Sequence, residues 1–211
     1  MDLPEVGDQV PRRQDPRTQK LGIQILRHSG WQIMGNVPNL PRVVVIGAPH
    51  TSNWDGVVAM SLIQALQIRI NIMGKDSLFK YPVAREFLRW LGIFPIDRSS
   101  PQGVVEQTVE RMQAAPQMWL GLSPEGTRKK ASKWKNGFYR IAQLAEVPIL
   151  MVALDFGRRQ IRFAPLFEPS GDFDLDMRHI LGFFSDAAPC RPEMLSAPLV
   201  KYRHAQNLLK Q

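Results

Sequence analysis

A histidine and an aspartate stand close together in the segment Ala48-Pro49-His50-Thr51-Ser52-Asn53-Trp54-Asp55. The apolar run before it, residues 43–47, predicts a buried strand, and residues 56–66 predict a helix. Side chains at the carboxyl end of such a strand point into the crevice where α/β proteins bind ligands. A carboxylate that holds one imidazole nitrogen leaves the other free to take a proton from a hydroxyl group. His50 and Asp55 are therefore candidates for the base and its partner in a transfer reaction at a hydroxyl.

A purely structural interpretation of this pair is equally consistent with these residues taken alone. Asp55 would then be the N-cap of the following helix, and His50 an ordinary loop residue. A metal site is less favoured, because the other histidines, His28, His179 and His204, are distant in sequence. We therefore predict no metal ligands.

A second polar loop follows the predicted strand 93–96, which ends in Asp97-Arg98. An arginine guanidinium stays charged and can bind phosphate through two hydrogen bonds. Ser99 and Ser100 come next, near the predicted start of a helix, where backbone N–H groups favour anions. Arg98 is therefore a candidate phosphate ligand. The alternative is an ion pair between Asp97 and Arg98 at the surface, which stabilises little.

A third polar loop, Ser123-Pro124-Glu125-Gly126-Thr127-Arg128, follows the predicted strand 118–122. Glu125 can hold a substrate hydroxyl, Gly126 permits close approach of the backbone, and Arg128 offers a second anion ligand. We place Thr127 in the same candidate binding loop. Much of the chain's net charge of +8 lies after this loop. Such a charge run is usually a solvated surface, but here it directly follows a strand end, which favours a bound anion.

The order of predicted elements indicates the fold class. Strands and helices alternate from residue 42 onward, which predicts a single α/β domain with a mixed, mostly parallel sheet flanked by helices. In the helix at 82–91, Val83, Phe87, Trp90 and Leu91 are predicted to face inward. We expect a loose lead-in at 1–16 and the domain at 17–211, with its motif core at 42–164. The expected strands are 43–47, 68–73, 93–96, 118–122, 149–154 and 160–164, and the expected helices 17–30, 56–66, 82–91, 101–114, 136–146 and 198–211.

If these strands are parallel, the three polar loops converge on one crevice. A base beside two arginines then predicts a substrate with a phosphate near the reacting hydroxyl.

Composition narrows the class of partner. The positive charge favours an anionic partner such as a membrane surface, a phosphorylated substrate or a nucleic acid. Nucleic acid is not expected, because the cations gather around a strand-end loop rather than along a recognition helix. The single cysteine, Cys190, excludes an intrachain disulfide and fits a reducing compartment. No apolar run approaches the ~20 residues that cross a bilayer. The helix at 17–30 either packs on the domain's core, which is favoured, or lies on a lipid headgroup layer.

Four sequence blocks, in order, resemble the signature of the glycerolipid acyltransferase superfamily. The first is His50 to Asp55, with four residues between them; the second is Gly92 to Arg98; the third is Glu125-Gly126-Thr127-Arg128; and the fourth begins at Val147-Pro148 and ends at Met151. The four blocks span residues 48–151. One such block is a weak signal, whereas four in order with family spacing are a strong one.

The resemblance implies an O-acyltransferase that moves a fatty acyl group from acyl-CoA or acyl-carrier protein to a lysophospholipid. The expected acceptor is 1-acyl-sn-glycerol-3-phosphate, and the expected product is phosphatidate. His50 is then the general base, Asp55 orients it, and Arg98 and Arg128 bind the acceptor's phosphate. Glu125 and Gly126 shape that pocket. No cofactor is expected beyond the thioester co-substrate. The resemblance further implies work at the cytoplasmic face of the cell membrane, with peripheral contact to anionic lipid.

Two positions depart from the family's pattern. Ser123 stands where an aromatic or aliphatic residue usually precedes Pro-Glu-Gly, and Met151 stands where the fourth block commonly ends in proline. We expect both to shape the acyl or acceptor pocket, and Met151 to widen the acyl tunnel. The alternatives are another lysolipid or aminolipid acceptor, or a non-catalytic basic module that binds membrane or nucleic acid.

Overall fold

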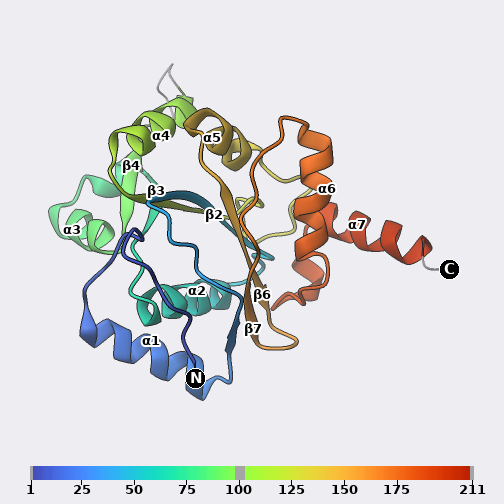
Figure 1. Ribbon diagram of the computed structural model, residues 1–211, viewed down its shortest axis with the longest axis horizontal. Helices are drawn as coiled ribbons and strands as arrows, with labels where there is room; N and C mark the ends of the chain where they lie inside the picture. The colour runs from blue at the N-terminus through green and yellow to red at the C-terminus, as the bar shows by residue number, and fades with distance from the viewer. Residues whose placement is uncertain (1, 98–102, 210–211) are drawn as a thin grey trace.

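The computed structural model describes residues 2–97 and 103–209 and has one central sheet with helices on both faces (Figure 1). The strands are β1 Gln32–Met34, β2 Arg42–Ala48, β3 Ile70–Lys75, β4 Ile93–Ile96, β5 Met118–Leu122, β6 Ile149–Asp155 and β7 Gln160–Phe163. The helices are α1 Pro16–His28, α2 Asn53–Ala65, α3 Pro82–Trp90, α4 Gly103–Ala114, α5 Gly137–Ala145, α6 Phe173–Phe184 and α7 Ala197–Leu208, with short 3-10 turns η1 Asp76–Phe79 and η2 Pro192–Met194.

The sheet has seven strands in the order β1-β7-β6-β2-β5-β3-β4. Among the described strands, β6 and β7 pair antiparallel and the other neighbouring pairs are parallel. Strand β2 lies between β5 and β6, so its carboxyl end is central. The predicted fold class, a single α/β domain with a mostly parallel sheet, is confirmed, and the expected strands 149–154 and 160–164 form the neighbouring strands β6 and β7.

Alternate residues of β2 pack into two separate hydrophobic cores, as expected for a strand that is buried on both faces. Val44 and Ile46 pack with α4 and α5, whereas Val43 packs with α1 and α2. The apolar side of α1 is buried on α2, where Gly22 lets the two backbones approach closely. The favoured interpretation of the helix at 17–30, packing on the domain's own core, is therefore confirmed.

The structure contradicts the inward orientation predicted for the helix at 82–91. Helix α3 forms as expected, but Val83 is 85% exposed, Phe87 59% and Trp90 47%. The reason is topological. Strands β3 and β4 are the last two of the sheet, and α3, which connects them, lies beyond the edge strand at the left of Figure 1. An edge position offers no second layer to cover an apolar helix face.

Two further differences concern the first part of the chain. Strand β1 was not predicted, because three residues of mixed polarity carry almost no periodic signal. The lead-in at 2–15 contains no helix, yet Val10 is fully buried and Arg12 forms a β-bridge with Ile68. Among the described helices, none is long and apolar enough to span a bilayer.

Candidate active site

The His50 loop leaves the carboxyl end of β2, at the centre of the sheet, and leads directly into α2. Helix α2 begins at Asn53, three residues earlier than predicted, and its N-cap is Ser52, whose hydroxyl accepts a hydrogen bond from the Trp54 N–H (2.9 Å). Asp55 is the third residue of the helix and completes a capping box with Ser52. The interpretation of Asp55 as the N-cap is therefore wrong, and the helix terminus fixes Asp55 through the box instead.

Asp55 joins the helix end to the histidine. Its Oδ2 accepts hydrogen bonds from the backbone N–H groups of Thr51 (2.6 Å) and Ser52 (2.7 Å), and lies 3.2 Å from His50 Nδ1. The Asp55 side chain is 1% exposed, whereas that of His50 is 29% exposed. The backbone bonds hold the carboxylate in place, so it selects the imidazole tautomer that carries its proton on Nδ1. The other ring nitrogen, Nε2, has no hydrogen bond to the described part of the chain, so its lone pair is available to accept a proton.

Glu125 supports the same loop from behind. Its Oε2 accepts a hydrogen bond from the backbone N–H of His50, across 75 positions of sequence. Glu125 is almost fully buried, and this burial raises the pKa of its carboxyl to about 7, an effect that the His50 N–H bond partly offsets. The structure thus gives Glu125 a contact with the backbone of the His50 loop. The predicted role of Glu125 in shaping a substrate pocket stays a prediction.

The rest of the third block lies at the surface beside the first. Gly126 has a φ of +63°, which favours glycine, and a Cβ there would meet the Lys135 side chain. The Thr127 hydroxyl accepts a hydrogen bond from the Lys129 N–H. Arg128 Nη1 donates to the side-chain oxygen of Asn53, the first residue of α2. The predicted convergence of the first and third loops is confirmed.

The second block is only partly described. Strand β4 ends at Ile96, at the same sheet edge as the other two loops. Arg98, the predicted phosphate ligand, lies outside the described residues, as do Ser99 and Ser100. Within the described ranges, no group of three or more His, Cys, Asp or Glu side chains is placed to hold a metal ion.

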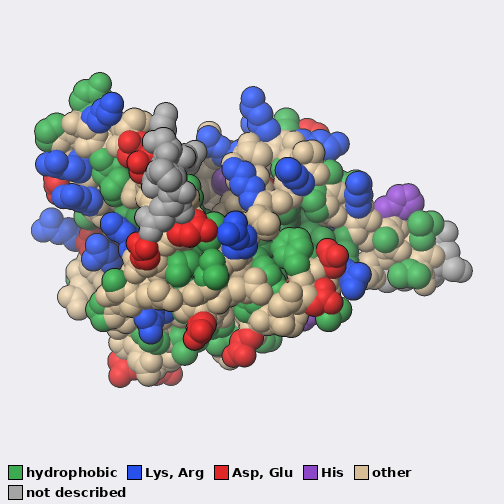
Figure 2. Space-filling model, turned by 90° about the horizontal axis from the view of Figure 1, so that it is seen from above, with side chains coloured by type: hydrophobic (Ala, Val, Ile, Leu, Met, Phe, Trp, Pro, Cys, Tyr) green, Lys and Arg blue, Asp and Glu red, His purple; other side chains and the backbone are tan. Residues whose placement is uncertain are grey.

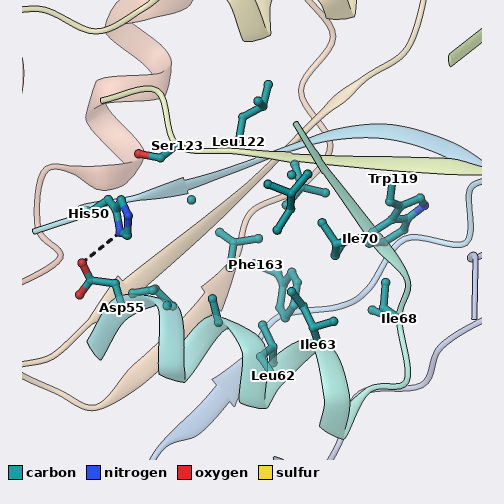
Figure 3. A pocket seen from close by; sticks show the side chains of 18 of the residues that line it. His50, Asp55, Leu62, Ile63, Ile68, Ile70, Trp119, Leu122, Ser123 and Phe163 are labelled. Carbon is teal, nitrogen blue, oxygen red and sulfur yellow. Dashed lines mark hydrogen bonds and ion pairs between the residues drawn. The ribbon is translucent and has the colours of Figure 1, made fainter. Parts of the chain in front are cut away.

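An apolar cavity of about 340 Å³ runs from the His50–Asp55 pair into the protein between the sheet and α2. Figure 3 shows His50, Asp55 and Ser123 at one end, and Ile68, Ile70 and Trp119 at the other. The walls between them come from α2, β3, β6 and β7, and include Leu62, Ile63, Ile72, Val152, Leu154 and Phe163. Apart from the residues at its mouth, the lining is almost entirely hydrophobic, so the cavity fits a hydrocarbon chain.

A second cavity of about 700 Å³ lies on the opposite face of the sheet, against α4 and α5. It meets the first at Leu122 and Ser123, which line both. Its lining mixes cations with apolar groups and includes Lys133, Trp134, Lys135, Phe138 and Ile141. The sheet edge beside His50 therefore opens on two separate spaces, as a reaction between two bulky substrates requires.

The two departures from the family's pattern have different outcomes. Ser123 lines both cavities, as expected for a pocket-shaping position, and its buried hydroxyl has no hydrogen-bond partner in the described part of the chain. Met151 does not line either cavity. It points into the core beneath α5 and α6, on the face of the sheet opposite the apolar cavity. The prediction that Met151 widens an acyl tunnel is therefore wrong for this cavity. Successive side chains of a strand point to opposite faces of the sheet, and on β6 it is the neighbouring Val152 that points to the cavity side.

Sequence reasoning missed two groups that support the site. Ser196, which precedes α7, accepts a hydrogen bond from Trp134 Nε1 (2.9 Å) and lies against the Glu125 carboxyl. Thr51 Oγ1 accepts the backbone N–H of Arg191 (3.2 Å), which ties the His50 loop to the segment before η2. Neither contact has a local sequence signal, since each joins segments more than 60 residues apart.

Comparisons with known proteins agree with this geometry. The model of the acyltransferase family matches residues 32–155, which is more than half of the chain. The 1-acyl-sn-glycerol-3-phosphate acyltransferase of Streptococcus pneumoniae is 28% identical over 130 residues, which cover 58% of this chain and 48% of that protein. This chain thus spans about half the length of the curated relative it matches. The crystal structure of the 1-acyl-sn-glycerophosphate (LPA) acyltransferase PlsC from Thermotoga maritima has a similar fold (TM-score 0.55, 18% identity) over 93% of this chain and 80% of that one.

Proposed function

The chain belongs to the acyltransferase family, and from this premise we propose that it transfers a fatty acyl group from a thioester to the hydroxyl of a lysophospholipid. The thioester is acyl-CoA or an acyl-carrier protein, and the first candidate acceptor is 1-acyl-sn-glycerol-3-phosphate. The acceptor proposal draws on the printed names of the two relatives. We assign the donor's acyl chain to the apolar cavity and the acceptor to the second cavity.

In the proposed reaction His50 is the general base. Its Nε2 takes the proton of the acceptor hydroxyl while the oxygen attacks the thioester carbonyl. Asp55, held by the Thr51 and Ser52 N–H groups, stabilises the resulting imidazolium. The tetrahedral intermediate then collapses, the C–S bond breaks, and the proton on His50 passes to the departing thiolate. The products are an ester and a free thiol, and His50 returns to its neutral state.

The apolar cavity supports the assignment of the donor's acyl chain. Its mouth is at His50 and Ser123, and Ile68 and Trp119 line its far end (Figure 3). A chain that fills it places its thioester carbonyl beside His50 and outside the hydrocarbon lining. Burial of the chain stabilises the complex by about 0.8 kcal/mol per CH₂ group.

The second cavity supports the assignment of the acceptor. It begins at Ser123, next to the reacting groups, and carries Lys133 and Lys135. Arg128 stands on the adjoining loop, oriented by Asn53. We assign the acceptor's phosphate to these cations and its hydrocarbon to the apolar part of the lining. The acceptor would be drawn from the inner face of the cell membrane.

The hydrogen-bonded His50–Asp55 pair at the mouth of an apolar cavity is the observation that carries the proposal. The test is purified protein with a panel of lysolipids and acyl thioesters, in which thiol release and the lipid product are both followed. We expect His50→Ala to lower the rate by about 10²–10⁴-fold.

His204→Ala, on the remote helix α7, is the matched control and should keep full activity. A His50→Ala variant as active as the wild type would rule out His50 as the general base. Faster transfer to an acceptor without phosphate would replace the proposed acceptor with another lysolipid or an aminolipid.

A further inference from the structure

Helix α3 presents an uncovered apolar stripe to solvent. Val83, Phe87 and Trp90 stand at positions i, i+4 and i+7, on one side of the helix, and are 85%, 59% and 47% exposed. The Phe87 and Trp90 rings stack at 5.9 Å. Leu78 and Tyr81, just before the helix in sequence, are also exposed. We call these five residues the α3 ridge. Isolated exposed apolar side chains are ordinary, but five that are grouped in this way indicate an interaction surface.

Arginines flank the α3 ridge. A groove of about 320 Å³ beside α3 is lined by Arg69, Arg89 and Arg111. Arg13 lies over the Trp90 ring at 5.0 Å and donates to the Trp90 carbonyl. Figure 2 shows Lys and Arg side chains gathered at the left end of the molecule, the end that α3 forms in Figure 1, with hydrophobic side chains among them.

The α3 ridge begins at the edge of the sheet that holds the active site. Turn η1 directly follows the carboxyl end of β3, and β3 runs parallel to β5, which in turn runs parallel to β2. Leu78 and Tyr81 therefore lie toward the same sheet edge as the His50 loop. Trp90 and the groove arginines lie toward the opposite edge, where β3 and β4 begin, so the whole surface runs along the side of the molecule from the His50 edge to the other edge.

We propose that the α3 ridge and its flanking arginines are the surface by which this protein docks on an anionic lipid bilayer. The apolar side chains enter the boundary between headgroups and acyl chains, and Arg69, Arg89 and Arg111 contact the acidic headgroups. Trp and Tyr are the side chains that prefer this boundary, because they have an apolar body and a polar tip. This assignment rests in part on the proposed function, since a lipid substrate has to be taken from a membrane.

The charge pattern favours a bilayer over a second protein copy. The acids of residues 76–90 are Asp76 and Glu86, and Glu86 is shared between Arg85 (3.4 Å) and Arg89 (3.3 Å). With the groove arginines added, the surface is strongly basic. A copy of the same surface would repel it, whereas a layer of anionic headgroups is complementary to it.

The test is sedimentation of the full chain with phosphatidylcholine vesicles that contain, or lack, about one third phosphatidylglycerol. No lysolipid and no thioester are present, so binding is measured without catalysis. We expect binding to the anionic vesicles that weakens in high salt. The double variant Val83→Gln/Phe87→Gln should bind at least about 10-fold more weakly. The double variant Arg69→Gln/Arg89→Gln should lose the preference for anionic vesicles.

The matched control is Leu208→Gln/Leu209→Gln. These residues are 60% and 83% exposed, close to the values for Phe87 and Val83, but lie at the end of α7. This control should bind vesicles like the wild type, and circular dichroism should show that all variants are folded. The proposal is overturned if the wild type does not bind vesicles, if the α3 variant binds as well as the wild type, or if both pairs weaken binding equally. It is also overturned if the α3 variant only disrupts a dimer in sedimentation velocity.

Activity on a monomeric short-chain acceptor separates this proposal from the proposed function. The α3 variant should keep that activity and lose activity only toward an acceptor presented in vesicles. Vesicle binding without acyl transfer would refute the function and leave the docking surface in place. Transfer to the monomeric acceptor without vesicle binding would refute the docking surface and leave the proposed function in place.

Discussion

His50 is held from two sides by carboxylates in different environments. The Asp55 carboxylate accepts hydrogen bonds from two backbone N–H groups. Burial of Glu125 disfavours its charged form and raises the pKa of its carboxyl to about 7. The first carboxylate acts on the imidazole ring and the second on the backbone that carries it. A single histidine is thereby fixed in both position and tautomer.

The raised pKa of Glu125 predicts how stability depends on pH. From about pH 4.5 to about pH 7 the folded state binds a proton that the unfolded state has lost, so stability falls as pH rises through this window and stays lower above it. The shift corresponds to about 3 kcal/mol. Glu125→Gln keeps an acceptor for the His50 N–H but does not titrate. We expect urea unfolding at pH 5 and pH 8 to show the wild type losing this much relative to the variant. A constant difference between the two proteins would contradict the assignment.

At the scale of elements, the site depends on where α2 begins and on what supports it. The capping box at Ser52 and Asp55 starts the helix directly beneath the His50 loop. Helix α1 then packs along α2 on its outer side, with Gly22 at the closest approach. Since α2 also forms one wall of the apolar cavity, the fit of α1 against α2 sets the width of the candidate acyl site.

Two glycine substitutions test this packing. A Cβ at Gly22 would lie 2.5 Å from the Ser61 backbone oxygen, whereas a Cβ at Gly56 of α2 meets nothing within 4 Å. Gly22→Ala should therefore destabilise the protein by about 1–3 kcal/mol, despite its gain in helix propensity. Gly56→Ala should stabilise it by about 0.5–1 kcal/mol, because nothing opposes that gain. Thermal unfolding measures both changes in stability. If Gly22→Ala stabilised the protein, the close approach of α1 to α2 at Gly22 would be contradicted.

At the scale of the whole molecule, the sheet separates two cavities that meet only at its carboxyl edge. Leu122 and Ser123 of the β5 end are the shared wall. A strand buried on both faces sends successive side chains to opposite sides, so one strand end serves both spaces. The α3 ridge lies outside these layers, beyond β4, which leaves it free for a partner.

The depth of the apolar cavity predicts selectivity for acyl-chain length. Ile63 of α2 lies toward the end far from His50 (Figure 3). Ile63→Trp should shorten the cavity and lower kcat/KM for long-chain thioesters at least about 10-fold relative to short-chain ones, at a cost in stability of about 1–3 kcal/mol. Leu144→Trp, at a half-exposed position of α5, is the control and should leave the preference unchanged. Competition between long and short thioesters gives the ratio, and an unshifted ratio would place the acyl chain elsewhere.

Sequence patterns were sufficient to predict the α/β class with a mostly parallel sheet, and the position of His50 and Asp55 between a strand end and a helix start. These follow from local patterns: apolar runs of strand length, helical periodicity, and a motif that bridges a strand end and a helix start. Sequence patterns also favoured the correct packing of the helix at 17–30 on the core.

The assembled fold was needed to show which helix faces are covered and which distant residues contact the motif loops. An amphipathic period shows that α3 has an apolar side, but not that α3 sits beyond an edge strand with nothing to cover it. On β6 the side chain of Val152 points into the cavity and that of Met151 points into the core on the other face of the sheet. A shift of one residue along the strand would exchange the two faces. The support of His50 by Glu125 spans 75 positions. Contacts between distant segments, edge position and strand parity are properties of the assembled sheet, which is why local sequence patterns did not contain them.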